Sequence, residues 1–270
     1  MSLYIYKNHK IKKKFGQNFL FNKDDILSII NVIKPKYDDI MVEIGPGLGA
    51  LTKVMSCYVD ELTVIEIDKD LVNMLLCMDL FKKNVIILEM DVRKFDFYSL
   101  YYKKKKLLRI FGSLPYNNAM SIILYLSKYR NFVHDMYFVL QKEIAYRLAA
   151  KPNSKFYGKL SIIIQYYYNV FLFFDIHPSS FKPSPKVYSI VVRFVPLIFP
   201  DVFVENLNNF NNLLNCVFSY RRKILKNSLC RFFTIEELKK IKINIFSRAE
   251  NLSVKDFCLL SNYISDKTKI

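Results

Sequence analysis

The stretch VEIGPGLGALT, from Val42 to Thr52, decides the fold that this sequence predicts. The short apolar run Ile40 to Ile44 leads into Gly45, Gly47 and Gly49, after which apolar residues recur at the spacing of one helical face. This order predicts a buried strand, a sharp glycine turn and a helix. Glycine permits the turn and lets a ligand approach the backbone closely. Because three of the chain's six glycines lie in this loop, we expect the loop to form part of a site.

The glycine loop alone is compatible with two kinds of ligand. Gly45, Gly47 and Ala50 satisfy the dinucleotide pattern G-x-G-x-x-G/A, and Glu66 follows at the distance at which an acidic residue holds a ribose. A nicotinamide cofactor and S-adenosylmethionine (SAM) therefore both remain open at this point. A purely structural turn in an α/β fold is the third interpretation, and the rest of the chain has to separate the three.

Predicted strands and helices alternate on both sides of this loop. Strands are expected at residues 62–68, 84–91, 107–111 and 136–140, and helices at 26–33, 71–80 and around 124–126. Such alternation predicts a mostly parallel sheet with helices on both faces. Ligands of these sheets bind outside the carboxyl ends of the strands. Gly45, Glu66, Asp91 and Ser113 all fall at such ends, so we expect them at one edge of the sheet.

The last third of the chain has a different character. Residues 160–176 and 187–195 are rich in β-forming residues and are expected to pair antiparallel at the sheet edge. Amphipathic helices are expected at 207–218, 234–241 and 253–264. We therefore predict a catalytic domain over residues 1–200, beginning with a basic arm at 1–14, and a small all-helical domain over residues 201–270.

Charge and cysteine usage narrow the class of partner. Lys and Arg number 41 against 24 Asp and Glu, a formal net charge of +17, which favours a polyanionic partner such as nucleic acid. The five cysteines are scattered without C-x-x-C spacing, so neither a metal site nor a disulfide framework is expected. No signal peptide and no apolar run of about 20 residues is found, so we expect a cytoplasmic protein without a membrane partner.

The segment Ser113-Leu114-Pro115-Tyr116 separates the open interpretations. It has the form [N/D/S]-x-P-[Y/F/W], a loop of methyltransferases that act on an amino group attached to a ring. The lone pair of such an amine is delocalised into the ring, and hydrogen-bond acceptors such as the Ser113 side chain favour a tetrahedral nitrogen that recovers it. Pro115 fixes the loop, and Tyr116 offers a face on which a base can stack. Positioning and electrostatics suffice for transfer from a strongly electrophilic donor, so no metal is required.

The chain resembles the small-subunit ribosomal RNA adenine N6-dimethyltransferases, the kasugamycin-sensitivity family, over nearly its whole length. The matching segments are FGQNFL at 15–20, EIGPGLGALT at 43–52, EID at 66–68, MDVRKFDF at 90–97, FGSLPYN at 111–117, FKPSPKVYSIVVRF at 181–194, FSYRRKILKNSL at 218–229 and RAENLSVKDF at 248–257. The resemblance implies a Rossmann-like, SAM-dependent methyltransferase domain and a helical domain that helps to bind RNA. It also implies dimethylation of two adjacent adenosines near the 3′ end of small-subunit rRNA, in an immature small ribosomal subunit, and we expect a monomer.

Matching positions imply the site residues. Those expected to line the cofactor site are Asn18, Leu20, Gly45, Gly47, Glu66, Asp91 and Ser113. Glu66 would hold the ribose hydroxyls and Asp91 the adenine amine of SAM. Ser113, Leu114, Pro115 and Tyr116 would hold the target adenine, extruded from the RNA, with Phe181 on its other face. The residues expected to contact RNA phosphate are Arg221, Arg222, Lys223, Lys226 and Arg231.

The chain departs from the family pattern at three places. Ser113 stands where the family usually has Asn, Asn118-Ala119-Met120 replaces the usual Ile-Ser/Thr pair, and Tyr188 stands where Asp is common. Two rival functions remain: a macrolide-resistance-type adenine N6-methyltransferase of large-subunit rRNA, and a ribosome assembly factor on the same fold without turnover. A nicotinamide dehydrogenase is disfavoured, because neither a proton-relay His nor a Tyr-x-x-x-Lys site is evident.

Overall fold

The computed structural model of the protein describes residues 5–6, 9–12, 15–78, 84–220 and 223–267. Arg221 and Arg222, two of the five basic residues expected to contact RNA, lie outside the described residues, as do Lys7, Lys13 and Lys14 of the basic arm. The chain divides into two compact units. The first comprises Met1–Ala145 and Asn169–Pro196, and the second Tyr146–Tyr168 and Leu197–Ile270.

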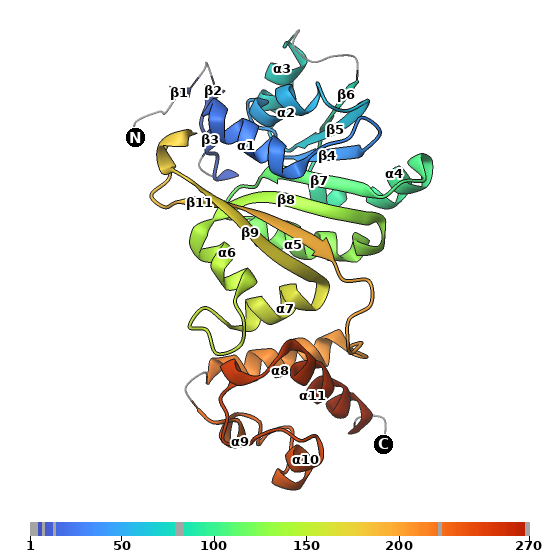
Figure 1. Ribbon diagram of the computed structural model, residues 1–270, viewed down its shortest axis with the longest axis vertical. Helices are drawn as coiled ribbons and strands as arrows, with labels where there is room; N and C mark the ends of the chain where they lie inside the picture. The colour runs from blue at the N-terminus through green and yellow to red at the C-terminus, as the bar shows by residue number, and fades with distance from the viewer. Residues whose placement is uncertain (1–4, 7–8, 13–14, 79–83, 221–222, 268–270) are drawn as a thin grey trace. The chain divides into compact units, whose positions relative to one another are not determined.

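The first unit is built on a seven-stranded sheet with the order β6-β5-β4-β7-β8-β11-β9 (Figure 1). Its strands are β4 (Ile40–Ile44), β5 (Glu61–Glu66), β6 (Val85–Glu89), β7 (Leu108–Ser113), β8 (Val133–Gln141), β9 (Tyr168–Ile176) and β11 (Ser189–Pro196). Strands β6, β5, β4, β7 and β8 run parallel, and β11 pairs antiparallel with β8. The mostly parallel α/β fold expected from the sequence is thus confirmed.

The strand order places a switch point beside the glycine loop. From β4 the chain moves outward through β5 to β6, and then crosses back to β7 on the other side of β4. At such a switch point the connections after the two central strands diverge and leave a crevice at their carboxyl ends. The residues that follow β4 and β7 are Gly45 and Leu114, so both segments singled out in the sequence border this crevice.

Helices cover the sheet between the strands. They are α1 (Lys23–Ile33), α2 (Ala50–Met55), α3 (Lys69–Leu76), α4 (Phe97–Lys104), α5 (Ala119–Leu126) and α6 (Lys142–Ala149), with the 3₁₀ helices η2 (Val92–Lys94), η3 (Ser127–Phe132) and η4 (Pro178–Ser180). The expected start of α1 is confirmed, because the Asn22 side chain accepts a hydrogen bond from Asp25 N. Buried Ile26, Ile29 and Ile33 of α1 pack with Met41 and Phe111 of the sheet.

Three two-residue strands complete the first unit near the glycine loop and the arm. Strands β1 (Ile5–Tyr6) and β2 (His9–Lys10) pair with each other, and β3 (Phe19–Leu20) pairs antiparallel with β10 (Phe181–Lys182). The second pairing places Phe181 opposite Leu20. The FGQNFL segment is therefore held to the segment that carries Phe181, although the two are far apart in sequence.

One secondary-structure prediction was wrong. Residues 159–167, expected to begin a strand, form the helix α7 (Lys159–Tyr167), and β9 begins only at Tyr168. Gly158 N donates to Ser161 Oγ at 3.1 Å at the start of this helix. Ile162 and Tyr166, four residues apart, are both buried in the core of the second unit, so tertiary packing overrides the β-propensity of the isoleucines. The rest of the prediction holds, since β9 lies beside β11 at the sheet edge.

The second unit is helical, as expected for the end of the chain. Besides α7 it contains α8 (Leu207–Ser219), α9 (Leu225–Ser228), α10 (Ile235–Lys240), η5 (Ala249–Asn251) and α11 (Val254–Lys267). Its core includes Phe210, Leu213, Leu214 and Val217, which form one face of α8. Residues 146–168, placed in the first domain by the sequence, belong to this unit because Tyr157, Ile162 and Tyr166 pack in the same core. Among the described residues, no helix is long and apolar enough to span a membrane.

Candidate active site

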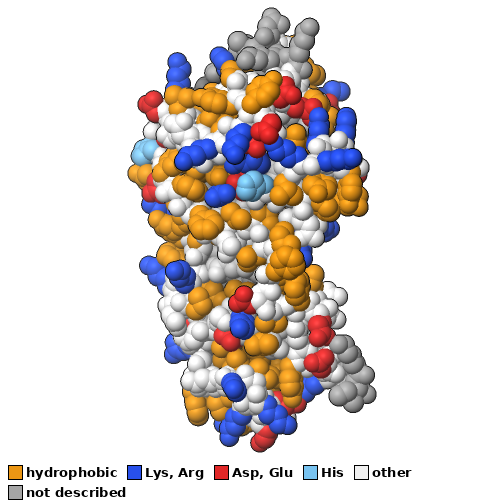
Figure 2. Space-filling view, turned by 45° about the vertical axis from the view of Figure 1, so that its right-hand side comes forward, with side chains coloured by type: hydrophobic (Ala, Val, Ile, Leu, Met, Phe, Trp, Pro, Cys, Tyr) orange, Lys and Arg blue, Asp and Glu red, His pale blue; other side chains and the backbone are white. Residues whose placement is uncertain are grey.

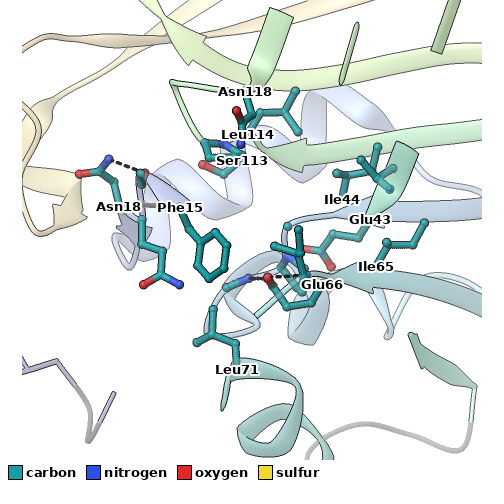
Figure 3. A pocket seen from close by; sticks show the side chains of 18 of the residues that line it. Phe15, Asn18, Glu43, Ile44, Ile65, Glu66, Leu71, Ser113, Leu114 and Asn118 are labelled. Atoms are coloured by element: carbon teal, nitrogen blue, oxygen red, sulfur yellow. Dashed lines mark hydrogen bonds between the residues drawn. The ribbon is translucent and has the colours of Figure 1, made fainter. Parts of the chain in front are cut away.

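A pocket of the first unit lies at the carboxyl ends of β4, β5, β6 and β7 (Figure 3). It encloses about 1080 Å³ of space, counted to its open mouth. The structure brings together here all the residues expected to bind the cofactor or the target base: Asn18, Leu20, Gly45, Gly47, Glu66, Asp91, Ser113, Leu114, Pro115, Tyr116 and Phe181. Four neighbouring strands therefore deliver these groups to one place, as the alternation in sequence predicted.

The glycine loop forms one wall of the pocket. Gly45, Gly47 and Gly49 have φ angles of 67°, 59° and 76°, in the left-handed region that other residues rarely adopt. A Cβ atom on Gly47 would lie 2.8 Å from Cδ1 of Phe19. Only glycine at position 47 therefore allows the FGQNFL segment to pack directly onto the loop.

Glu66 ends β5 with its carboxylate held by the backbone. Its Oε1 accepts hydrogen bonds from Ile67 N at 2.8 Å and Asp68 N at 2.9 Å, and its Oε2 accepts from Gly47 N at 3.3 Å. The residue is 6% exposed, and burial raises the pKa of its carboxyl to about 7. These contacts fix the carboxylate at the end of its strand, where it lines the pocket beside the glycine loop.

Glu43 is a second buried carboxyl group on the pocket wall, and the sequence analysis did not assign it a role. It lies in β4, is 1% exposed, and its Oε2 has no hydrogen-bond partner among the described residues. Burial raises the pKa of Glu43 to about 8, and the neighbouring Glu66 adds to the rise. The only signal in the sequence was its position directly before the glycine loop.

The raised pKa of Glu43 predicts a loss of stability as the pH rises. The unfolded chain releases this proton near the ordinary pKa and the folded chain only at higher pH, so raising the pH from 5 to 8 favours unfolding. Glu43→Gln should reduce this dependence and stabilise the protein at pH 8 by up to about 4 kcal/mol. Urea midpoints at pH 5, 6, 7 and 8 without ligand measure the effect. Glu89→Gln, at an exposed position in β6, is the control and should follow the parent. Equal profiles for all three proteins would contradict the expectation.

Asp91 follows β6 and carries its own counter-ion. Its Oδ1 accepts from Arg93 N at 2.9 Å, and Arg93 Nη2 donates to Oδ2 at 2.5 Å. These hydrogen bonds from Arg93 lower the pKa of Asp91, so the group is a carboxylate at neutral pH. Asp91 lines the pocket and can accept a hydrogen bond from an amine, although Arg93 already uses part of its capacity.

Asp68 anchors the N-terminal segment over the pocket, a contact that the sequence analysis missed. Its side chain is 1% exposed and accepts hydrogen bonds from Lys12 Nζ and, at 2.7 Å, from Gln17 Nε2. It also accepts from Asp70 N at 3.1 Å, at the start of α3. The EID and FGQNFL motifs are thus joined through Asp68 and Gln17. This anchor holds the segment that carries Asn18 and Leu20 against the glycine loop.

The Ser113–Tyr116 loop begins where β7 approaches β4 most closely. A Cβ atom on Gly112 would lie 2.1 Å from the carbonyl oxygen of Ile44, so position 112 requires glycine. Leu114 is buried, and the Tyr116 hydroxyl forms a 2.7 Å hydrogen bond with Ser189 Oγ in β11. Burial raises the pKa of Tyr116. The loop is therefore fixed at both ends while the Ser113 side chain lines the pocket.

The remaining predicted residues differ in their surroundings. Phe181 lines the pocket, but its side chain is 1% exposed, so a base can stack on it only after its neighbours shift. Lys223, Lys226 and Arg231 belong to the helical unit and are exposed. They are free to meet solvent or a polyanion.

Comparison with known proteins agrees with these features. The family model of ribosomal RNA adenine dimethylase matches residues 8–266. The ribosomal RNA small subunit methyltransferase A of Buchnera aphidicola is 45% identical over 97% of this chain and 96% of its own length. The protein of the same name from Pasteurella multocida is 42% identical over 96% of this chain and 91% of its own length.

Two solved structures share the fold. A dimethyladenosine transferase from Plasmodium falciparum superposes with a TM-score of 0.77 at 24% identity, covering 92% of this chain and 98% of its own. The 23S rRNA methyltransferase ErmE superposes with a TM-score of 0.70 at 18% identity, covering 92% of this chain and 99% of its own. The match to the family model and the identity to the curated relatives extend over nearly all of the sequence. The chain therefore belongs to the ribosomal RNA adenine dimethylase family.

Proposed function

We propose that this protein transfers methyl groups from SAM to N6 of two adjacent adenosines near the 3′ end of small-subunit rRNA. The observation that carries the proposal is the pairing, in one pocket, of the backbone-held Glu66 carboxylate with the Ser113–Tyr116 loop. One group suits a ribose and the other an amine attached to a ring. The curated relatives, named for small-subunit methylation, support the choice of RNA.

The residues around the pocket fit SAM. Glu66 is positioned to accept hydrogen bonds from the ribose hydroxyls, and the ionised Asp91 to accept one from the adenine amine. The glycine loop leaves its backbone open to close approach, and the buried acid Glu43 suits the cationic end of the cofactor. SAM supplies an electrophilic methyl group: the N6 lone pair forms the new C–N bond as the S–C bond breaks, the positive charge passes from sulfur to nitrogen, and the amine then releases one proton to water.

The protein's part in the reaction is to hold the amine. Ser113 Oγ accepts a hydrogen bond from the N6 amine and so favours the tetrahedral nitrogen on which the charge develops. The Tyr116 ring, held by Ser189, supports the target base by stacking. Phe181 completes the base site once its neighbours have moved.

The RNA partner is matched by charge. The net charge of +17 and the exposed Lys223, Lys226 and Arg231 favour binding to phosphate, and Figure 2 shows groups of Lys and Arg side chains on one face. An immature small ribosomal subunit is the proposed substrate, the cytoplasm the proposed location, and a monomer the proposed state. Binding to small subunits should weaken steeply with added salt, because counterions are released from the phosphates.

The cofactor assignment makes a direct prediction about Glu66. Glu66→Ala should weaken SAM binding by about 1–3 kcal/mol, because charge-assisted hydrogen bonds to the ribose are lost. Calorimetric titration with SAM and with NAD measures this, and Glu89→Ala, at an exposed position one strand away, is the control. Binding of NAD by the parent, or an unchanged SAM affinity in the Glu66 variant, would contradict the assignment.

One experiment tests the proposed reaction. The protein is incubated with labelled SAM and with undermethylated small or large subunits in parallel, and the modified adenosines are mapped. Methylation of the small subunit near the 3′ end of its rRNA supports the proposal. Methylation of the large subunit alone supports the macrolide-resistance type, and no transfer to either supports an assembly factor without turnover.

A further inference from the structure

The chain reverses direction directly after the Ser113–Tyr116 loop. Asn118 N and Ala119 N both donate to the carbonyl oxygen of Pro115 at 3.0 Å, which makes residues 115–118 a tight turn. Asn118 thereby returns to the wall of the pocket that Ser113 helps to form. Figure 3 shows Asn118 with Ser113 and Leu114 at the same end of the pocket, which all three line.

The side chain of Asn118 is not used by the helix that it begins. Asn118 occupies the N-cap position of α5, where asparagine ordinarily accepts a hydrogen bond from the helix backbone. Asn22 and Asn206 do so at the starts of α1 and α8. Asn118 has φ −114° and ψ −7°, in place of the extended conformation of those two residues, and makes no such bond. Its carboxamide is exposed and faces the pocket instead.

The proposed reaction leaves a place for this carboxamide. An unmethylated adenine N6 carries two N–H groups, and both need acceptors if the nitrogen is to become tetrahedral. Ser113 has one short hydroxyl group, and it stands where the family usually has an asparagine. Asn118 returns a carboxamide to the same pocket from the other end of the turn.

We propose that the side-chain oxygen of Asn118 accepts the second N–H of the target amine and shares with Ser113 the positioning of N6. This inference rests on the proposed function. Asn118 takes up no proton, because an amide oxygen is only an acceptor here, and the proton released after methyl transfer still passes to water. A consequence follows for the two steps: after the first methyl transfer the amine keeps a single N–H, so the second transfer needs only one acceptor.

The test is single-turnover methylation of undermethylated small subunits at saturating SAM, with singly and doubly methylated adenosine resolved by mass spectrometry. Asn118→Ala should slow the first transfer by about 3- to 10-fold and leave the second within about twofold of the parent. SAM affinity and the unfolding midpoint should not change. Asn118→Asp, which keeps an oxygen acceptor, should stay closer to the parent in the first step.

Two further variants make the comparison sharp. Asn117→Ala is the matched control, because Asn117 lies in the same turn with its Nδ2 atom 3.6 Å from the place of a Cβ on Gly16. The second is Ser113→Asn, alone and with Asn118→Ala. With an asparagine at position 113, loss of the Asn118 side chain should cost less than it does in the parent.

The possible results separate the inference from the proposed function. Equal losses in Asn117→Ala and Asn118→Ala, or equal slowing of both transfers by Asn118→Ala, would show that the turn rather than the carboxamide matters, and would overturn the inference. A parent-like Asn118→Ala would overturn it as well. If the parent itself methylates no small subunit, the proposed function fails first.

Discussion

Arg109→Leu is expected to lower the free energy of unfolding by about 3–5 kcal/mol, the usual cost of removing one partner from a buried ion pair. Arg109 lies in β7 with its side chain 9% exposed. Its Nε donates to Asp135 Oδ1 at 2.8 Å, and its Nη1 donates to Asp39 Oδ2 at 2.7 Å. The substitution would leave both carboxylates with fewer partners, and the Asp135 side chain is 0% exposed.

The same guanidinium also closes the end of α1. Arg109 Nη2 donates to the carbonyl oxygen of Ile33 at 2.7 Å, and Nη1 donates to that of Lys34 at 3.3 Å. The last carbonyl groups of a helix lack partners within the helix, and a positive charge near them is favourable. One side chain therefore joins three strands and a helix, at residues that precede or begin the strands, away from the pocket.

Urea unfolding at neutral pH measures the effect of Arg109→Leu. The control is Lys106→Leu, which removes an exposed lysine paired with Asp38 and should leave the midpoint almost unchanged. Because a domain of this kind is stable by only about 5–15 kcal/mol, the Arg109 variant should unfold at a much lower urea concentration. Equal midpoints for the two variants would show that the network contributes no more than a surface pair.

The sequence predicted the parts of this protein that depend on neighbours in the chain. Strand β4 has the expected bounds, and the Asn22 cap of α1 and the capping box of Thr234 and Glu237 in α10 were visible as local patterns. The gathering of Glu66 and Ser113 at one edge followed from the direction of parallel strands, because their carboxyl ends meet on the same side.

The missed features depend on contacts between residues far apart in sequence. The bonds of Arg109 to Asp39 and Asp135 and those of Gln17 to Asp68 join different strands or segments, and no local periodicity records them. The helix α7 was predicted as a strand because its isoleucines favour strands, whereas the core of the second unit buries them at helical spacing. The orientation of Asn118 likewise depends on the turn at Pro115, which composition does not specify.

The site prediction with the largest expected effect concerns the Tyr116 ring. Tyr116→Ala should slow single-turnover methylation of small subunits by roughly 5- to 150-fold, because base stacking on an aromatic side chain is worth about 1–3 kcal/mol. Tyr116 should matter more than Phe181, since Tyr116 is only partly buried and Phe181 is almost wholly covered by its neighbours. SAM affinity should change little, because Glu66 and Asp91 remain in place.

Two variants separate the ring of Tyr116 from its hydroxyl group. Tyr116→Phe keeps the stacking face and loses only the 2.7 Å hydrogen bond to Ser189, so it should cost about 0.5–1.5 kcal/mol of stability and keep most of the methylation rate. Tyr188→Ala removes an exposed aromatic ring next to β11 and should methylate like the parent. If Tyr116→Phe is as slow as Tyr116→Ala, the hydroxyl group holds the loop and stacking contributes little. If Tyr116→Ala is as fast as the parent, the target base does not rest on this ring.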